Sequence, residues 1–317
     1  MSTIQAINGI HHITAISSSA AATVAFYENV LGLHLVKQTV NFDDPFTYHL
    51  YFGDRHGSPG TILTFFPWSD MPRGTFGAGM ITAIAFEIPA GALDYWHQRL
   101  QHQRIAARSG TRFGDDMLSC TDPDGLTLEL IASARPDSTT GSGAGAASPG
   151  QGIRGFHSAT ALTRSADKTG ALLTRSLGMI QREQQHDRVR FAMNTGESPG
   201  RFYDLVVDPQ AKDGQQGSGT IHHIAFRTPS DAEQVQWQRV LRDDGYQVTA
   251  VRDRNYFKSI YFHEPGGVLF EIATDPPGFT VDERPEHLGS ALKLPEQYET
   301  RRAEIVSRLP PLHRDKN

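Results

Sequence analysis

The 317-residue sequence has almost no cysteine and no surplus of basic charge. Its one cysteine, Cys120, cannot form a disulfide within the chain and lies in no Cys spacing typical of zinc sites. Any bound metal would therefore be held by histidine and carboxylate side chains. The 30 Lys and Arg against 35 Asp and Glu give a net charge of −5 without a basic run, which argues against a nucleic-acid partner.

Long hydrophobic runs are also absent. No stretch approaches the roughly 18 consecutive apolar residues of a membrane-spanning helix. The first residues, MSTIQAINGIHH, lack the charged and then apolar pattern of an export signal. We therefore expect a soluble, cytoplasmic protein without a membrane partner. The chain is long enough for two domains of ordinary size, each with its own core.

A segment without apolar periodicity divides the chain nearly in half. Residues 136–152, PDSTTGSGAGAASPGQG, are rich in Gly, Ser, Ala and Thr, a composition typical of a flexible linker. We predict an N-terminal domain at residues 1–135, a C-terminal domain at residues 153–275, and a tail at residues 276–317.

The tail contains an amphipathic helical pattern. Residues 299–312, ETRRAEIVSRLPPL, carry apolar residues at helical spacing, and we expect the helix to end at Pro310. The segment is too short and too charged to anchor in a membrane. We expect it to dock either on the body of its own chain or on a second subunit of a homo-oligomer, and the sequence leaves both open.

One structural unit is repeated four times along the chain. Each copy opens with a strand-like segment, continues with an amphipathic helical pattern, and ends with about three further strand-like runs. The opening segments are residues 9–16, 79–88, 153–162 and 219–228, and the helical patterns are residues 20–32, 90–102, 168–178 and 232–245. The pattern predicts an α+β fold of four βαβββ units. A small sheet with one helix cannot close alone, so we expect the units to pair into two open barrels with a cavity.

Two of the opening segments carry adjacent histidines in near-identical surroundings, GIHHITA at residues 9–15 and TIHHIAF at residues 220–226. Adjacent side chains on a strand point to opposite faces, so each doublet offers one histidine to a cavity and leaves the other behind it. A single histidine at the start of a strand is more often structural. Two doublets at equivalent positions of a repeat indicate a repeated chemical group.

Comparison of the copies isolates one complete set of metal ligands. Copy four combines a histidine doublet with Glu271 in EPGGVLFEIAT, whereas copy two keeps the equivalent Glu129 in DPDGLTLELIA but has Thr and Ala in place of the histidines. We therefore interpret Glu129 as structural. A further histidine must come from copy one, which has His11 and His12, or from copy three, which has His157. Two histidines and one carboxylate form the facial triad typical of non-haem Fe(II) oxygenases.

The repeated βαβββ pattern resembles the vicinal oxygen chelate superfamily, which includes glyoxalase I, bleomycin-resistance proteins and extradiol ring-cleaving dioxygenases. The resemblance covers almost the whole chain. Residues 260–271, IYFHEPGGVLFE, are similar to the extradiol pattern of an aliphatic residue, Tyr, two spacers, an acidic residue, Pro, any residue, Gly and a later Glu. The resemblance implies that Glu271 is the metal-binding carboxylate and that Tyr261 lies beside the oxygen site.

One departure from that pattern points to a particular branch. The extradiol pattern has a histidine six residues before its aliphatic position, where this chain has Arg254. Such a replacement resembles the branch that cleaves para-hydroquinones, as do GIHHITAI and the stretches at residues 48–68 and 275–299.

The branch also implies a choice among the histidines. It uses the second histidine of each doublet, which maps to His12 and His223. Ordinary extradiol enzymes take the first ligand from the third unit, where His157 stands, so His157 is the alternative to His12.

The resemblance implies an Fe(II)-dependent extradiol-type dioxygenase that inserts both atoms of O₂ into a hydroquinone or catechol ring, with Mn(II) left open as the metal. Arg254 would stabilise a phenolate as a fixed cation, and Tyr261 would donate a hydrogen bond at the oxygen site. His222 or His11, just behind the ligands, would serve as general base. The alternatives without a catalytic role are that Arg254 is a surface arginine and that Tyr261 is an aromatic residue of the core.

Two other function classes compete with a dioxygenase. A glyoxalase-like, metal-dependent lyase or isomerase normally uses a second carboxylate or a glutamine among its ligands, which a His/His/Glu set lacks. A metal-free binding module is usually much shorter and would not need a full set of ligands. The ligand set therefore favours the dioxygenase.

Overall fold

A computed structural model describes residues 6–134, 150–193, 196 and 198–312 of the chain. The predicted linker at residues 136–152 lies almost entirely outside these residues, so its conformation stays a prediction. Of the described residues, no helix combines the length and the apolar character needed to cross a bilayer.

The first half of the chain contains two successive βαβββ units. The first unit consists of β1 (Ile10–Ser17), α1 (Ala20–Val24) continued by the π-helical segment η1 (Ala25–Val30), β2 (His34–Val40), β3 (Tyr48–Gly53) and β4 (Ile62–Pro67). The second consists of β5 (Met80–Pro89), α2 (Leu93–His102), β6 (Arg108–Arg112), β7 (Asp115–Thr121) and β8 (Thr127–Ser133).

Two further units and a tail follow. The third unit consists of β9 (Phe156–Thr163), α3 (Asp167–Ala171) continued by the π-helical segment η2 (Leu172–Ser176), β10 (Ile180–Gln185), β11 (Arg188–Ala192) and β12 (Phe202–Val207). The fourth consists of β13 (Ile221–Thr228), α4 (Asp231–Asp243), β14 (Arg252–Asp253), β15 (Lys258–His263) and β16 (Leu269–Thr274). The tail holds η3 (Phe279–Val281), η4 (Pro285–His287), η5 (Glu296–Arg301) and α5 (Arg302–Arg308). The predicted α+β fold of four βαβββ units is confirmed.

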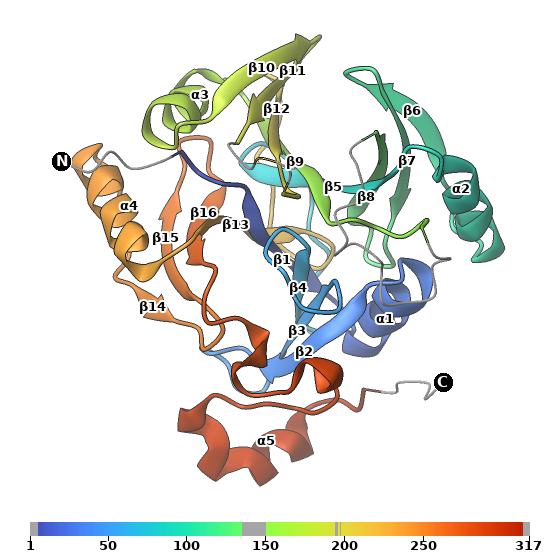
Figure 1. Cartoon of the computed structure of the whole chain (residues 1–317), viewed down its shortest axis with the longest axis vertical. Helices are drawn as coiled ribbons and strands as arrows, with labels where there is room; N and C mark the ends of the chain where they lie inside the picture. Colours follow the sequence, from blue (N-terminus) through green and yellow to red (C-terminus); the bar gives the residue numbers. More distant parts are fainter. Residues whose placement is uncertain (1–5, 135–149, 194–195, 197, 313–317) are drawn as a thin grey trace.

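The strands form two eight-stranded sheets, each curled into a half-barrel (Figure 1). The first has the order β14-β15-β16-β13-β1-β4-β3-β2, and the second has the order β10-β11-β12-β9-β5-β8-β7-β6. Unit one therefore pairs with unit four, and unit two pairs with unit three. Each sheet takes four strands from either side of the predicted linker, so residues 1–135 and 153–275 are halves of the sequence but not separate sheets.

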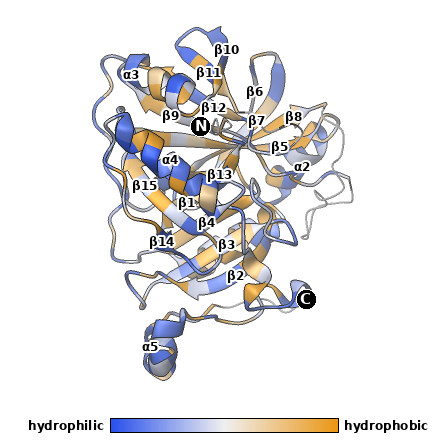
Figure 2. Ribbon diagram, turned by 60° about the vertical axis from the view of Figure 1, so that its left-hand side comes forward, coloured by the Kyte–Doolittle hydropathy of each residue, from blue (hydrophilic) through white to orange (hydrophobic). Residues whose placement is uncertain are grey.

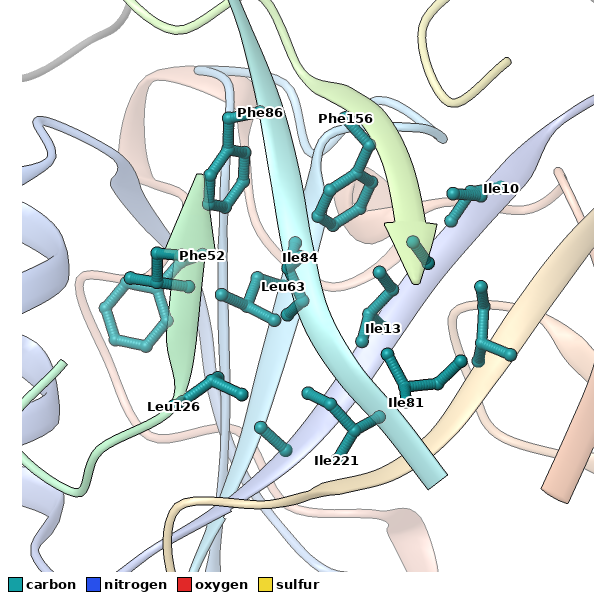
Figure 3. Close-up of a cluster of buried hydrophobic side chains, with 14 of the residues drawn as sticks. Ile10, Ile13, Phe52, Leu63, Ile81, Ile84, Phe86, Leu126, Phe156 and Ile221 are labelled. Atoms are coloured by element: carbon teal, nitrogen blue, oxygen red, sulfur yellow. The ribbon is translucent and has the colours of Figure 1, made fainter. Parts of the chain in front are cut away.

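One apolar core joins the two sheets. It is built on the opening strands of the units, whose inward side chains meet between the sheets (Figure 3). Within the second sheet, Phe86 of β5 and Phe156 of β9 add to this core and stack with their ring centroids 5.4 Å apart. Figure 2 shows the matching hydropathy, with apolar residues concentrated in the central strands and hydrophilic residues on the outer faces of α4 and β10.

The tail docks on the body of its own chain, at the lower edge of the first sheet in Figure 1. The Tyr298 hydroxyl donates a hydrogen bond of 2.7 Å to the carbonyl of Phe42. The guanidinium of Arg308 lies 3.5 Å from the ring centroid of Phe46, and Ile305 of α5 is fully buried. These contacts tie the tail to the loop between β2 and β3.

Two glycine-rich linkers cross where the sheets meet. The segments GTFGAG at residues 74–79 and GQQGSG at residues 214–219 connect units one and two and units three and four. They lie side by side, with backbone bridges that pair Thr75 with Gln215 and Ala78 with Asp213. A Cβ atom on Gly217 would overlap the backbone of Pro72 and Gly74. Glycine is needed here for close approach of two backbones.

Replacing Gly217 by Ala is therefore expected to lower the free energy of unfolding by about 2 kcal/mol or more, because the added methyl group would force apart two backbones that are held together by bridges. Urea denaturation would measure the change. Gly91→Ala is the matched control, since its Cβ would meet nothing within 4 Å, and it should leave stability unchanged or slightly raised. Equal midpoints for Gly217→Ala and the unaltered chain would contradict the tight crossing.

Candidate metal centre and substrate pocket

Each histidine doublet lies on a β-bulge in the pairing of β1 with β13. His11 and His222 are the extra residues of the two bulges, so the regular alternation expected for the doublets is broken. The Nδ1 atoms of His11 and His12 are 2.9 Å apart, and those of His222 and His223 are 2.8 Å apart. We call His11 and His222 the outer histidines and His12 and His223 the inner ones. Each outer histidine therefore fixes the orientation of the ring of its inner neighbour.

The inner histidines converge with Glu271 on a single point. The Nε2 atoms of His12 and His223 are 3.3 Å apart, and they lie 3.4 Å and 3.0 Å from Oε2 of Glu271. All three side chains are buried, and they come from β1, β13 and β16, which are neighbours in the first sheet (Figure 1). Within the described parts of the chain, no other group of three His, Cys, Asp or Glu brings its ligand atoms so close.

The hydrogen-bonding pattern of this cluster fits a cation. We assign the Nδ1 proton of each inner histidine to the bond with its outer neighbour, which leaves a lone pair on Nε2. The Oε1 atom of Glu271 accepts a hydrogen bond of 2.5 Å from the Ser259 hydroxyl, whereas its buried Oε2 has no hydrogen-bond partner. Three lone-pair atoms that face one another repel unless a positive ion lies between them. The donor set is that of the 2-His-1-carboxylate triad.

Burial and charge set the protonation of the cluster. Burial lowers the pKa of His223, which favours the neutral form that binds metals. Burial alone would raise the pKa of Glu271, but the imidazoles of His12 and His223 outweigh it and hold that pKa well below its usual value. The carboxyl group is therefore ionised in the folded protein.

The outer histidines differ in what they can reach. His11 is 2% exposed, and its remaining nitrogen hydrogen-bonds the backbone of Thr274. His222 lines the cavity beside the cluster, and burial lowers its pKa to about 3. Because its Nδ1 accepts from His223, the neutral His222 carries its proton on Nε2 and can only donate from there. Both outer histidines are thus poorly placed as general bases, contrary to the role inferred from the sequence.

A cavity of about 490 Å³ opens beside the cluster. Its walls include the aromatic side chains of Phe42, Phe66, Trp68 and Phe257. Arg254 and Tyr261 line the same cavity, with the guanidinium carbon 5.8 Å from the centroid of the tyrosine ring. The surface-arginine alternative for Arg254 is wrong, because its side chain is only 16% exposed.

Arg254 and Tyr261 both keep their protons, one as a cation and the other as a neutral hydroxyl. Burial alone would lower the pKa of Arg254, but Tyr261 and Asp43 outweigh it and raise that pKa above its usual value. Burial raises the pKa of Tyr261 well above its usual value, and Glu271 raises it further. The cavity therefore presents a fixed cation and a protonated hydroxyl.

The sequence reasoning missed His49, which also lines the cavity. Its Nε2 lies 2.8 Å from the Thr64 hydroxyl, and its Nδ1 lies 2.8 Å from the Tyr51 hydroxyl. Burial lowers its pKa well below the usual value, so it is a neutral wall residue. His49 and Tyr51 are two residues apart on β3, so their side chains lie on the same face of the strand. This spacing was the feature of the sequence that could have indicated His49 as a cavity residue.

The second sheet repeats the frame of the site without its ligands. Its β5–β9 pairing has bulges at Thr82 and His157, and the Nδ1 atom of His157 lies 3.1 Å from the Ser158 hydroxyl. His157 therefore takes the position of the outer His11, in the other sheet, and is not part of the cluster. Glu129 accepts hydrogen bonds from both terminal nitrogens of Arg112, so an arginine neutralises it, as expected for a structural group.

The chain is similar to known proteins along most of its length. The sequence profile of the Glyoxalase/Bleomycin resistance protein/Dioxygenase superfamily matches residues 9–130 and 155–281. A Bacillus subtilis protein named "Putative ring-cleaving dioxygenase MhqO" is 46% identical, with 96% of each chain covered. The chlorohydroquinone/hydroquinone 1,2-dioxygenase of Sphingobium indicum is 33% identical, with 95% of each chain covered.

Solved structures agree with the fold. A crystal structure from Bacillus subtilis, described as a "putative dioxygenase", superposes with a TM-score of 0.93 at 44% identity over 98% of each chain. Glyoxalase I from Zea mays superposes with a TM-score of 0.61 at 14% identity, over 84% of this chain and 92% of that one, which reflects the shared fold alone. By its sequence profile, its repeated units and its relatives, the chain belongs to the glyoxalase/bleomycin resistance protein/dioxygenase superfamily.

Proposed function

We propose that the protein is an Fe(II)-dependent, extradiol-type ring-cleaving dioxygenase that inserts both atoms of O₂ into a hydroquinone. The observation that carries the proposal is the buried His12–His223–Glu271 cluster at the end of a cavity with aromatic walls. The names of the relatives from Bacillus subtilis and Sphingobium indicum support the same reaction class.

The donor set suits the proposed metal. Iron(II) held by two neutral imidazoles and one carboxylate would keep one positive charge and open positions, and it would supply the electron transfer that lets O₂ react with an aromatic ring. His11 and His222 fix the rings of His12 and His223, so that both Nε2 atoms face the same point. Mn(II) has overlapping ligand preferences and belongs in the same test.

The remaining residues of the cavity bind and orient the substrate. The aromatic walls exclude water and pack against the ring of the substrate. Arg254 stabilises a phenolate oxygen as a permanent cation, and Tyr261 donates a hydrogen bond from its protonated hydroxyl. His222 donates from Nε2 and helps to hold a substrate oxygen, so we propose a positioning role for it in place of general-base catalysis.

Anaerobic reconstitution with Fe(II), followed by oxygen uptake with hydroquinone and with catechol, tests the proposal. We expect O₂ consumption together with loss of the aromatic absorbance of the substrate. Zn(II)-loaded protein is the control, because zinc has no redox chemistry and should bind at the same ligands without oxygen uptake. Iron-loaded protein that consumes no O₂ but turns over a methylglyoxal–thiol adduct would favour the glyoxalase-like lyase or isomerase instead.

A further inference from the structure

The cavity is larger than one aromatic ring needs and is charged at its outer end. A cavity of roughly 150 Å³ already holds benzene in a protein, whereas this one measures about 490 Å³. His12 and His223 of the metal cluster are buried where they line it, whereas Asp43 and Arg252, which also line it, are exposed. A ring bound at the cluster therefore leaves room for a substituent that reaches these charges.

Of the two arginines, Arg252 makes the weaker ion pair with Asp43. Its side chain is 49% exposed, and its ion pair with Asp43 spans 4.0 Å, the upper limit for such a contact. Arg254 lies 3.4 Å from the same carboxylate and is far more buried. Both guanidinium groups face the ring of Tyr261, at 6.0 Å and 5.8 Å. Arg252 is therefore a nearly free cation beside the cavity.

The internal repeat shows that the fold does not need an arginine at this position. Arg252 pairs with Ser259 across β14 and β15, and the equivalent pairing across β6 and β7 joins Gly110 with Met117. The second sheet thus keeps an arginine, Arg112, at the position of Arg254 but has glycine at that of Arg252. Because β6 has no charged side chain at the position of Arg252, the fold itself does not require this charge. We therefore attribute its role to the cavity.

We propose that Arg252 is a specificity-determining residue, which forms an anion subsite for hydroquinones with a carboxylate or similar anionic ring substituent. This inference rests on the function proposed above and names its substrate class. Asp43 is two-thirds exposed and bridges both arginines, so it occupies the subsite when no substrate is bound. A substrate carboxylate takes its place as the partner of Arg252.

Calorimetric titration of the Fe(II)-loaded protein without O₂ tests the subsite, with 2,5-dihydroxybenzoate and hydroquinone as probes. Arg252→Ala should weaken binding of 2,5-dihydroxybenzoate about fivefold, the range of a partly exposed ion pair, and leave hydroquinone unchanged. Arg252→Lys should restore part of the loss. Arg239→Ala removes an equal charge from an exposed site on α4 and should change neither affinity.

A second variant separates substrate binding from support of the loop around Asp43. Asp43→Asn frees both arginines and should tighten binding of 2,5-dihydroxybenzoate about threefold, the opposite direction to Arg252→Ala. If both variants weaken binding, or if Arg252→Ala affects both probes equally, the subsite is overturned. Oxygen uptake with neither probe would defeat the proposed function, while the difference between the probes in binding would still decide the subsite.

Discussion

Replacing Glu271 by Gln is expected to abolish tight metal binding and, with it, ring cleavage. Glutamine keeps the shape of the side chain but removes the one negative charge that faces His12 and His223. Altering even an outer partner of a metal ligand costs about 10- to 100-fold in affinity, so loss of the charged ligand should exceed about 100-fold. Metal analysis after dialysis, together with oxygen uptake, would measure both effects.

Thermal unfolding separates loss of the metal site from misfolding. Added Fe(II) should raise the unfolding temperature of the unaltered protein, because a ligand that binds only the folded state stabilises it. It should leave that of Glu271→Gln unchanged. Cooperative unfolding of the metal-free variant would show that it still folds, so that its lack of metal reflects the site itself.

Glu129→Gln is the matched control in the second sheet. Glu129 takes the position of Glu271 in its own unit, but its partner is Arg112. The substitution should lower stability, because it leaves a buried guanidinium without its counter-ion, and should leave metal content unchanged. Metal loss in Glu129→Gln together with full metal content in Glu271→Gln would reverse the assignment of the active sheet.

Arg254→His is expected to lower kcat/KM for hydroquinones about 100-fold or more, while metal content and the activity toward catechol are retained. A catechol can bind a metal through two adjacent oxygens. A para-hydroquinone offers only one, and the protein must stabilise the rest of the ring. The partly buried and permanently charged guanidinium of Arg254 suits this task better than an imidazole, which loses its proton near neutral pH.

Steady-state kinetics on iron-loaded protein would measure the ratio of the two substrate classes. Arg254→Lys is the companion variant, since it keeps the charge but loses the planar fork, and it should fall between the other two proteins. Faster turnover of catechol than of every hydroquinone by the unaltered protein would defeat the hydroquinone assignment but not the dioxygenase.

The repeated unit and the ligand types were readable from the sequence because both are local. Strands and helices impose periods of 2 and 3.6 on nearby residues, so each βαβββ unit is visible within its own stretch of chain. The doublets and the turn before Glu271 recur at equivalent places of these units. Comparison between copies therefore predicted the second histidine doublet and Glu271 as partners and Glu129 as a structural residue, whereas the choice of His223 within the doublet came from the resemblance to the hydroquinone-cleaving branch.

The choice between His12 and His157 was beyond the local pattern. Both stand at the head of an opening strand, and only the sheet order shows that β1 lies next to β13 while β9 lies next to β5. The bulges add a second distinction, because they make His157 the counterpart of His11 and Ser158 the counterpart of His12. Bulges depend on the partner strand, so they leave little trace in one strand alone.

The sequence by itself thus determined the four units, the fold class and the residue types of the site. Only the tertiary structure decided that unit one pairs with unit four, and that Asp43, His49 and Arg252 meet at one cavity. The physical reason is that four similar units bury similar faces in any pairing. The choice among pairings rests on long-range contacts, such as the packing of the opening strands and the crossing of the two glycine-rich linkers, which no local period encodes.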